Sequence, residues 1–232
     1  MDAGMGLSVG ILDPAGCAAP VGPYSVILAD PPWQYKNWTA AKNGAQQAHY
    51  NGMTVEDIGS LGAPVRKWAD PRACVLFLWA TWPKLNEAFS VIDAWGWRYV
   101  TGLPWIKTTP SNGTIRRGTG FWVMGASEIL LIAVRGENPR RVRDNPVIGL
   151  LTGETPVFYH PRFEHSKKPE DVQAWIDRML PDGRRLELFA RRRRAGWDCA
   201  GLDTGYRLTE RGAEPYTPPQ APDDPQMDMF TQ

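Results

Sequence analysis

The chain has 232 residues, a mass of 25.9 kDa and a formal net charge of +1 at neutral pH. This length suits one α/β domain of ordinary size with a short appended segment. Because 43% of the residues are hydrophobic and 22% are charged, the composition excludes collagen-like, coiled-coil and intrinsically disordered chains. The longest apolar runs, near residues 73–80 and 128–134, fall far short of the about 18 residues of a membrane-spanning helix.

The amino terminus and the cysteines indicate a cellular compartment. The first twenty residues include Asp2 and Asp13 but no basic residue, so the positively charged start of a secretory signal is missing. Cys17, Cys74 and Cys199 are widely spaced and form no CxxC pair, which indicates neither a disulfide framework nor a zinc site. We therefore expect a cytoplasmic protein that binds no metal and no membrane.

Charge is unevenly distributed along the chain. Residues 135–194 carry 14 basic and 9 acidic side chains, whereas residues 195–232 carry 2 basic and 7 acidic ones. The first of these segments ends in four consecutive arginines, 191–194, and a basic surface of this kind binds phosphates. A solvated basic face explains the same charges, so this feature alone does not predict nucleic-acid binding.

Apolar periodicity predicts alternating strands and helices. Short runs rich in Val, Ile, Leu and aromatic residues predict strands at 25–29, 73–80, 98–106, 128–134 and 186–190. Capping and amphipathic patterns predict helices that begin after Thr54 and that cover 83–95 and 168–180. This alternation is typical of a doubly wound α/β fold with a mixed or parallel sheet.

Composition also predicts the domain boundaries. Residues 1–23 form an amino-terminal arm, residues 24–211 the folded domain, and residues 212–232 a disordered tail that is acidic and rich in proline. Residues 33–53 and 108–120 are predicted loops, and a long loop that a compact domain retains is usually functional.

The segment Asp30-Pro31-Pro32-Trp33 directly follows the first predicted strand. Its two prolines lack backbone donors, so we expect carbonyl oxygens beside the carboxylate that are free to accept hydrogen bonds. An exocyclic amine has two N–H donors that suit such acceptors, and Trp33 offers an aromatic face for a planar base. The segment therefore indicates a site for an aminated aromatic ring, with Trp33 as an exception among tryptophans that are otherwise expected in the core.

The tetrad resembles motif IV of the N6-adenine methyltransferases. Further blocks resemble, in order, the MT-A branch of that family, which includes the eukaryotic mRNA adenosine methyltransferase, and its compact bacterial and phage members most of all. These blocks are His49-Tyr50-x-x-Met53, CVLFLWAT at 74–81, Trp105-Ile106-Lys107-Thr108, the loop 116–120 with Trp122 and Glu128, His165-Ser166-x-Lys168-Pro169, and ELFAR at 187–191. Six blocks in the same order are far more specific than the tetrad alone.

The resemblance implies a fold, a reaction and a set of site residues. The fold is that of the S-adenosylmethionine-dependent methyltransferases, Rossmann-like, with the catalytic region ahead of the cofactor-binding strand in a permuted order. The reaction is transfer of a methyl group from S-adenosyl-L-methionine to adenine N6, without metal. Its implied residues are Asp30, Pro31, Pro32 and Trp33 for catalysis, Asp30, Lys168, Arg191 and Asp203 for the cofactor, and Tyr50, Arg116, Arg117 and Glu128 for the substrate.

One departure from the family pattern concerns the end of the core. The family usually has an asparagine plus an amide or acidic residue after a glycine there, whereas this chain has Gly201-Leu202-Asp203. Two interpretations follow: a ribose contact is lost, or Asp203 substitutes for it. The tail also contains Gln226-Met227-Asp228-Met229-Phe230, which resembles the peptide that docks bacterial proteins on the replication sliding clamp. A random tail sequence is the competing interpretation.

Two functions from different classes remain open. The first is an active adenine methyltransferase, with DNA favoured over RNA as substrate; a duplex substrate would require the adenine to be flipped out of the stack. The second is a catalytically silent nucleic-acid-binding partner of an active subunit. The intact tetrad at 30–33 favours the enzyme, and methylation of a small molecule or of protein glutamine is a third interpretation.

Overall fold

The computed structural model describes residues 20–35, 52–118, 122–137, 157–161, 168–169 and 171–217. Seven strands form one sheet in the order β5-β3-β4-β2-β1-β6-β7. The strands are β1 (Val26–Ala29), β2 (Ala73–Ala80), β3 (Arg98–Thr108), β4 (Ser127–Gly136), β5 (Phe158–Pro161), β6 (Arg185–Leu188) and β7 (Asp198–Ala200).

Strand β4 is the one strand of this sheet that runs against the others. It pairs antiparallel with β2 and with β3, whereas β1 pairs parallel with β2 and β6, β6 with β7, and β3 with β5. The first residues of β4 therefore lie at the same edge of the sheet as the carboxyl ends of its neighbours. That edge is where ligands bind in open α/β sheets.

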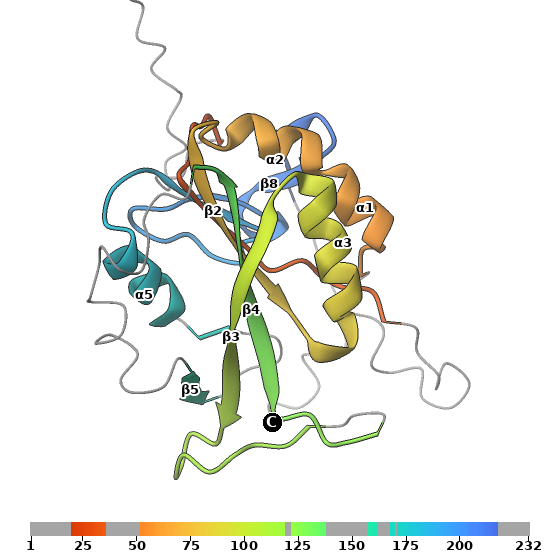
Figure 1. Ribbon diagram of the computed structural model, residues 1–232, viewed down its shortest axis with the longest axis vertical. Helices are drawn as coiled ribbons and strands as arrows, with labels where there is room; N and C mark the ends of the chain where they lie inside the picture. The colour runs from red at the N-terminus through yellow and green to blue at the C-terminus, as the bar shows by residue number, and fades with distance from the viewer. Residues whose placement is uncertain are drawn as a thin grey trace, which may run out of the picture.

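Helices cover both faces of the sheet (Figure 1). Helices α1 (Val55–Ser60), α2 (Gly62–Trp68) and α3 (Leu85–Trp95) lie on one face, and α5 (Asp171–Met179) lies on the other. The doubly wound α/β fold with a mixed sheet is thereby confirmed.

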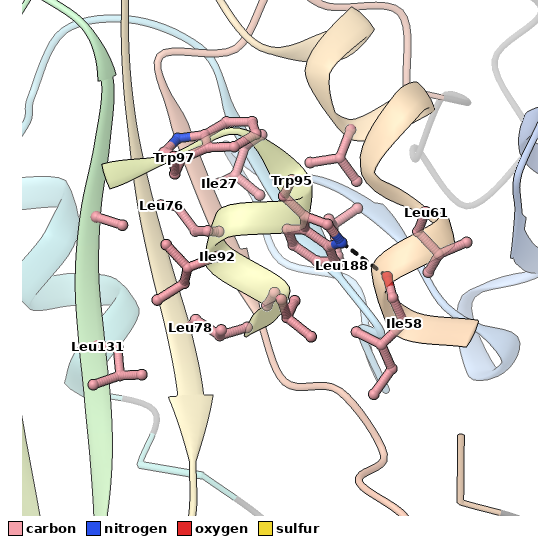
Figure 2. Close-up of a cluster of buried hydrophobic side chains, with 14 of the residues drawn as sticks. Ile27, Ile58, Leu61, Leu76, Leu78, Ile92, Trp95, Trp97, Leu131 and Leu188 are labelled. Atoms are coloured by element: carbon pink, nitrogen blue, oxygen red, sulfur yellow. Dashed lines mark hydrogen bonds between the residues drawn. The ribbon is translucent and has the colours of Figure 1, made fainter. Parts of the chain in front are cut away.

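Strands β1 and β2, near the middle of the sheet, are buried on both faces of the sheet. Their side chains alternate between the two faces, so each strand packs against the helices on both sides. On β2, Leu76 and Leu78 pack with α1 to α3, while Val75 and Phe77 pack with α5. Figure 2 shows the first of these clusters, in which the indole N–H of Trp95 donates a hydrogen bond of 2.8 Å to the carbonyl oxygen of Ile58 and so joins α3 to α1.

Most predicted elements lie where the sequence placed them. The strand at 73–80 and the helix that ends at Gly96 are confirmed; Gly96 adopts a left-handed conformation with φ of 85°, which closes α3. Helix α2 and the short strands β5, β7 and β8 (Tyr206–Thr209) were not predicted, because each has too few residues to show a period. No helix in the described part of the chain is long and apolar enough to span a bilayer.

The predicted start of the tail needs a correction. Strand β9 (Gly212–Pro215) pairs antiparallel with β8, and Leu208 and Ala213 of this hairpin pack against the core. Ordered structure thus continues past residue 212, because burial of these apolar side chains stabilises the hairpin despite the acidic residues around it. Residues 218–232, with the clamp-like peptide, lie outside the described residues, as do residues 1–19.

Candidate active site

Polar side chains from three strands meet at the carboxyl edge of the sheet. Asp30 follows β1, Lys107 lies near the end of β3, and Glu128 is the second residue of the antiparallel strand β4. Because neighbouring strands lie about 4.8 Å apart, β1 and β4 are separated by about 10 Å across β2. A long side chain is needed to connect them.

Lys168 makes that connection. Its Nζ lies 2.8 Å from Oδ1 of Asp30 and 3.2 Å from Oε2 of Glu128, and the Nζ of Lys107 lies 2.5 Å from Oε1 of Glu128. Acid and base therefore alternate along a chain of four groups, which we call the charge relay: Asp30, Lys168, Glu128 and Lys107. The ring of Trp79 lies beneath the ammonium group of Lys168, at 5.7 Å from Nζ to the ring centre.

The pKa values of the two carboxyl groups of the relay are shifted in opposite directions. Burial raises the pKa of Asp30 more than Lys168 lowers it, so the pKa lies above its ordinary value. Burial acts against ionised Glu128 as well, but Lys168 and Lys107 together outweigh it and lower the pKa of Glu128. The pKa of Lys168 is raised, because its two carboxylate partners outweigh the effect of burial. Asp30 is thus the acidic group of the relay that binds a proton most readily.

The turn after Asp30 differs from the prediction. The carbonyl oxygen of Pro31 accepts a hydrogen bond of 2.9 Å from the N–H of Trp33, and that of Pro32 accepts one of 2.7 Å from the N–H of Met53. The expectation that these carbonyls are free is therefore wrong, because the chain folds back and Met53 reaches the turn. Each carbonyl oxygen retains one lone pair, and Asp30 retains 25% exposure of its side chain.

Trp33 is a core residue and not an exception among the tryptophans. Its side chain is only 9% exposed, and its indole N–H donates a hydrogen bond of 3.1 Å to the carbonyl oxygen of Trp79. The sequence prediction failed here because nothing local indicated that the end of β2 would supply a partner for the N–H group. The side chain holds the turn after β1 in place.

Two exposed aromatic residues that the sequence did not single out lie beside the relay. Tyr35 is 41% exposed, its hydroxyl shares a hydrogen bond with that of Thr81, and burial, with the charges of Glu128 and Asp30, raises its pKa. Trp82 is 47% exposed, and its indole N–H donates a hydrogen bond of 2.9 Å to Ser127. Their position in the sequence could have indicated them, because each follows the carboxyl end of a buried parallel strand.

Of the four predicted cofactor residues, Lys168 lies between Asp30 and Glu128, whereas Arg191 and Asp203 lie on the opposite side of Asp30 from Glu128. Arg191 follows β6, which pairs with β1, and Asp203 lies in the short helix η3 (Leu202–Thr204) after β7. Two residues before Arg191, Phe189 has a φ of 61°, a strained conformation of the kind found at ligand sites. A Cβ atom on Gly201 would lie 2.1 Å from the carbonyl oxygen of Ala190, so only glycine fits there.

This edge suits S-adenosylmethionine, a ligand with an ammonium group, a carboxylate and ribose hydroxyls. The carboxylates of Asp30 and Asp203 match the ammonium and hydroxyl donors, and the guanidinium of Arg191 matches the acceptors. In the described part of the chain, no group of three or more His, Cys, Asp or Glu side chains is placed to hold a metal ion.

The remaining predicted substrate residues do not belong to the charge relay. Arg116 and Arg117 lie on the exposed hairpin between β3 and β4, and the N–H of Arg116 donates a hydrogen bond of 2.8 Å to the carbonyl oxygen of Lys107. Tyr50 lies outside the described residues. The structure therefore joins Asp30 to Glu128 through Lys168 and places Arg116 and Arg117 on a separate hairpin.

The mixed seven-stranded sheet with helices on both faces is consistent with the fold of S-adenosylmethionine-dependent methyltransferases. The family model MT-A70 matches residues 24–203. The chain belongs to the MT-A70 family, whose methyltransferases take the methyl group from S-adenosylmethionine.

Similar proteins come from eukaryotes and bacteria. A probable N(6)-adenosine-methyltransferase MT-A70-like protein of Oryza sativa is 28% identical over 216 residues, which cover 88% of this chain and 28% of that protein. The human N(6)-adenosine-methyltransferase catalytic subunit METTL3 is 27% identical over 172 residues, 74% of this chain and 26% of its own length. The type II methyltransferase M.MunI of a Mycoplasma species is 28% identical over 197 residues, 78% of this chain and 77% of its own. This chain thus spans about a quarter of the eukaryotic relatives.

Proposed function

We propose that this protein transfers a methyl group from S-adenosylmethionine to the N6 atom of adenine in DNA. Membership of the MT-A70 family supports the reaction, and the similarity to M.MunI over most of both chains favours DNA. The observation that carries the proposal is the placement of Asp30, a partly exposed carboxylate with a raised pKa, at the end of β1 beside Lys168 and Glu128.

Asp30 serves as a hydrogen-bond acceptor for the exocyclic amine. The lone pair of N6 is delocalised into the adenine ring, so the amine is a poor nucleophile. A hydrogen bond from N6–H to Asp30, and one to the remaining lone pair of the Pro31 carbonyl, localise that lone pair on nitrogen. The lone pair of N6 would form the bond to the methyl carbon as the carbon–sulfur bond breaks, the electron pair of that bond would stay on sulfur, and the proton that N6 then loses would pass to water.

Side chains that suit two different ligands lie on the two sides of Asp30. Arg191 and Asp203 lie toward β6 and β7 and would hold the methyl donor, which supplies an electrophilic methyl group. Glu128, Tyr35 and Trp82 lie toward β2 and β4, and their acceptor and aromatic faces suit the base. Lys168 links Asp30 to Glu128, and catalysis rests on positioning and on fixed charges.

The experiment that tests this proposal uses S-adenosylmethionine with an isotopically labelled methyl group. The purified chain is incubated with unmethylated DNA and, separately, with RNA, and the digested nucleosides are analysed by mass spectrometry. We expect labelled N6-methyladenine in the DNA, at a rate that falls by at least about a hundredfold in Asp30→Ala. Asp93→Ala, an exposed aspartate on α3, is the matched control and should retain full activity.

The other outcomes are equally informative. Label in RNA alone would move the substrate from DNA to RNA. Cofactor binding without transfer to either polymer would favour the silent-partner function, and unchanged transfer by Asp30→Ala would overturn the assignment of the site. The cytoplasmic location and the docking of residues 226–230 on the sliding clamp stay predictions.

A further inference from the structure

Two aromatic side chains beside the charge relay are exposed although their polar ends are held in place. Eight tryptophans in the described part of the chain are buried, whereas Trp82 is 47% exposed, and Tyr35 is 41% exposed. Trp82 donates to Ser127 at 2.9 Å, and the hydroxyl of Tyr35 shares a hydrogen bond with that of Thr81. The ammonium group of Lys84 lies 5.5 Å from the centre of the Tyr35 ring. The part of each residue that remains for a ligand is therefore its ring, which suits stacking on another planar group.

The same hydrogen bonds place the two rings near each other and next to the active site. Thr81, the partner of Tyr35, directly precedes Trp82 in the chain. Ser127, the partner of Trp82, directly precedes Glu128 of the charge relay. We call Tyr35 and Trp82 the aromatic pair. Because the polar end of each ring is already fixed, the pair loses little conformational freedom when a ligand stacks on it.

The aromatic pair lies farther along the strand direction than Asp30 does. Ala29, the residue before Asp30, pairs with Leu78 of β2, so Asp30 is level with Trp79. Trp82 follows three residues later, and the chain between them is extended. At about 3.3 Å per residue, its Cα atom lies about 10 Å beyond the level of Asp30. An adenine with its N6 atom at Asp30 occupies the space in front of that carboxylate, so the pair is placed for the base of an adjoining nucleotide.

We propose that the aromatic pair is a stacking subsite for the base next to the target adenine, on one side of it, and that this contact holds the strand in place while the adenine is at Asp30. This inference rests on the proposed function, because a target at Asp30 defines the neighbouring base. Enzymes that act on a nucleobase also contact the flanking nucleotides, and an aromatic ring stacks on any base. Two side chains are too few for a stable protein interface, which buries at least about 1,200 Å².

The test removes the neighbouring base and the ring separately and together. Methyl transfer is measured on single-stranded DNA with one adenine, and on the same strand with an abasic position directly before or directly after that adenine. Single strands are used because they need no unpairing. For the native chain, we expect one of the two abasic positions to lower kcat/KM by about tenfold, as for loss of one stacked base. In Trp82→Ala the same position should change kcat/KM by less than about twofold, because the ring that the base contacts is already absent.

Two further variants show that the effect belongs to the ring of Trp82. Trp82→Phe retains an aromatic face and should keep most of the native loss at the abasic position. Tyr99→Ala is the matched control, since Tyr99 is also 41% exposed but lies near the start of β3, at the opposite edge of the sheet. This control should show the full native loss.

A binding measurement makes the test independent of catalysis. Fluorescence anisotropy gives the affinity of each variant for the labelled intact strand and for the abasic strand. The native chain should bind the intact strand about tenfold more tightly, and Trp82→Ala should bind both strands alike, even if no methyl group is transferred. Binding that depends on the base and the ring together, without transfer, would support the subsite while the proposed function fails.

The opposite pattern would overturn the subsite and leave the proposed function standing. The native chain would then transfer methyl groups but lose nothing at either abasic position. Losses that multiply when Trp82→Ala meets the abasic strand would also overturn the proposal, because the ring and the base would then act independently.

Discussion

The indole N–H of Trp33 donates a hydrogen bond of 3.1 Å to the carbonyl oxygen of Trp79, which fastens the turn after β1 to the end of β2. We therefore expect Trp33 to act through position and not by stacking on the base. Trp33→Phe keeps an aromatic ring in the core but removes the N–H donor, and it should lower the free energy of unfolding by about 1 kcal/mol. Denaturant unfolding measures this loss, and the activity should fall far less than in Asp30→Ala. A rise in KM for DNA without a loss of stability would restore the stacking role.

Removal of Lys168 should change the pH dependence of the reaction. Lys168→Met takes away the charge that lowers the pKa of Asp30, so that pKa, already raised by burial, rises further. Ionised Asp30 is the acceptor, so the pH at which activity rises should be higher in this variant than in the native chain. The pH profile of kcat/KM measures the shift, and Lys168→Arg, which retains the charge, should keep the native profile. A uniform loss at every pH would contradict this account.

Removal of Lys107 should weaken binding of the DNA substrate and leave binding of S-adenosylmethionine unchanged. Lys107 helps to lower the pKa of Glu128, and both residues lie on the side of Asp30 away from Arg191. In Lys107→Met we expect the KM for DNA to rise by about tenfold, as for loss of one charge-assisted hydrogen bond, while the KM for S-adenosylmethionine stays constant. Arg98→Met removes an exposed basic residue at the start of the same strand and serves as the control. Equal effects on both KM values would contradict the division of the site.

Glu187 should make stability depend on pH. Burial raises its pKa to about 7, although Gln173 donates a hydrogen bond of 2.8 Å to the carboxyl group. The folded state thus binds this proton more tightly than the unfolded chain, so the stabilisation is complete below pH 4.5 and is lost as the pH rises toward 7. Glu187→Gln should be more stable than the native chain at pH 8 by up to about 3 kcal/mol and nearly equal to it at pH 4. Thermal unfolding at both values measures the difference, and a gain that is independent of pH would refute it.

The central strands and helix α3 were predictable because their signals are local. Every residue of β2 except the first is buried, and an apolar run of that length bounded by loops predicts a central strand. The helix ends at a glycine in the left-handed conformation, which sequence also indicates. By contrast, β5 and β7 have four and three residues and form only by pairing with longer strands.

The sequence by itself determined the family resemblance and the tetrad at the end of β1, and it predicted Asp30, Lys168 and Glu128 as site residues. Tertiary structure decided that these three groups are in contact, since Lys168 is 138 residues from Asp30 and reaches Glu128 only because β4 runs antiparallel. It also decided that Trp33 is buried and that Tyr35 and Trp82 are exposed beside the relay. The physical reason is that burial, pKa and hydrogen-bond partners depend on which strands become neighbours, and a local pattern of residues does not contain that information.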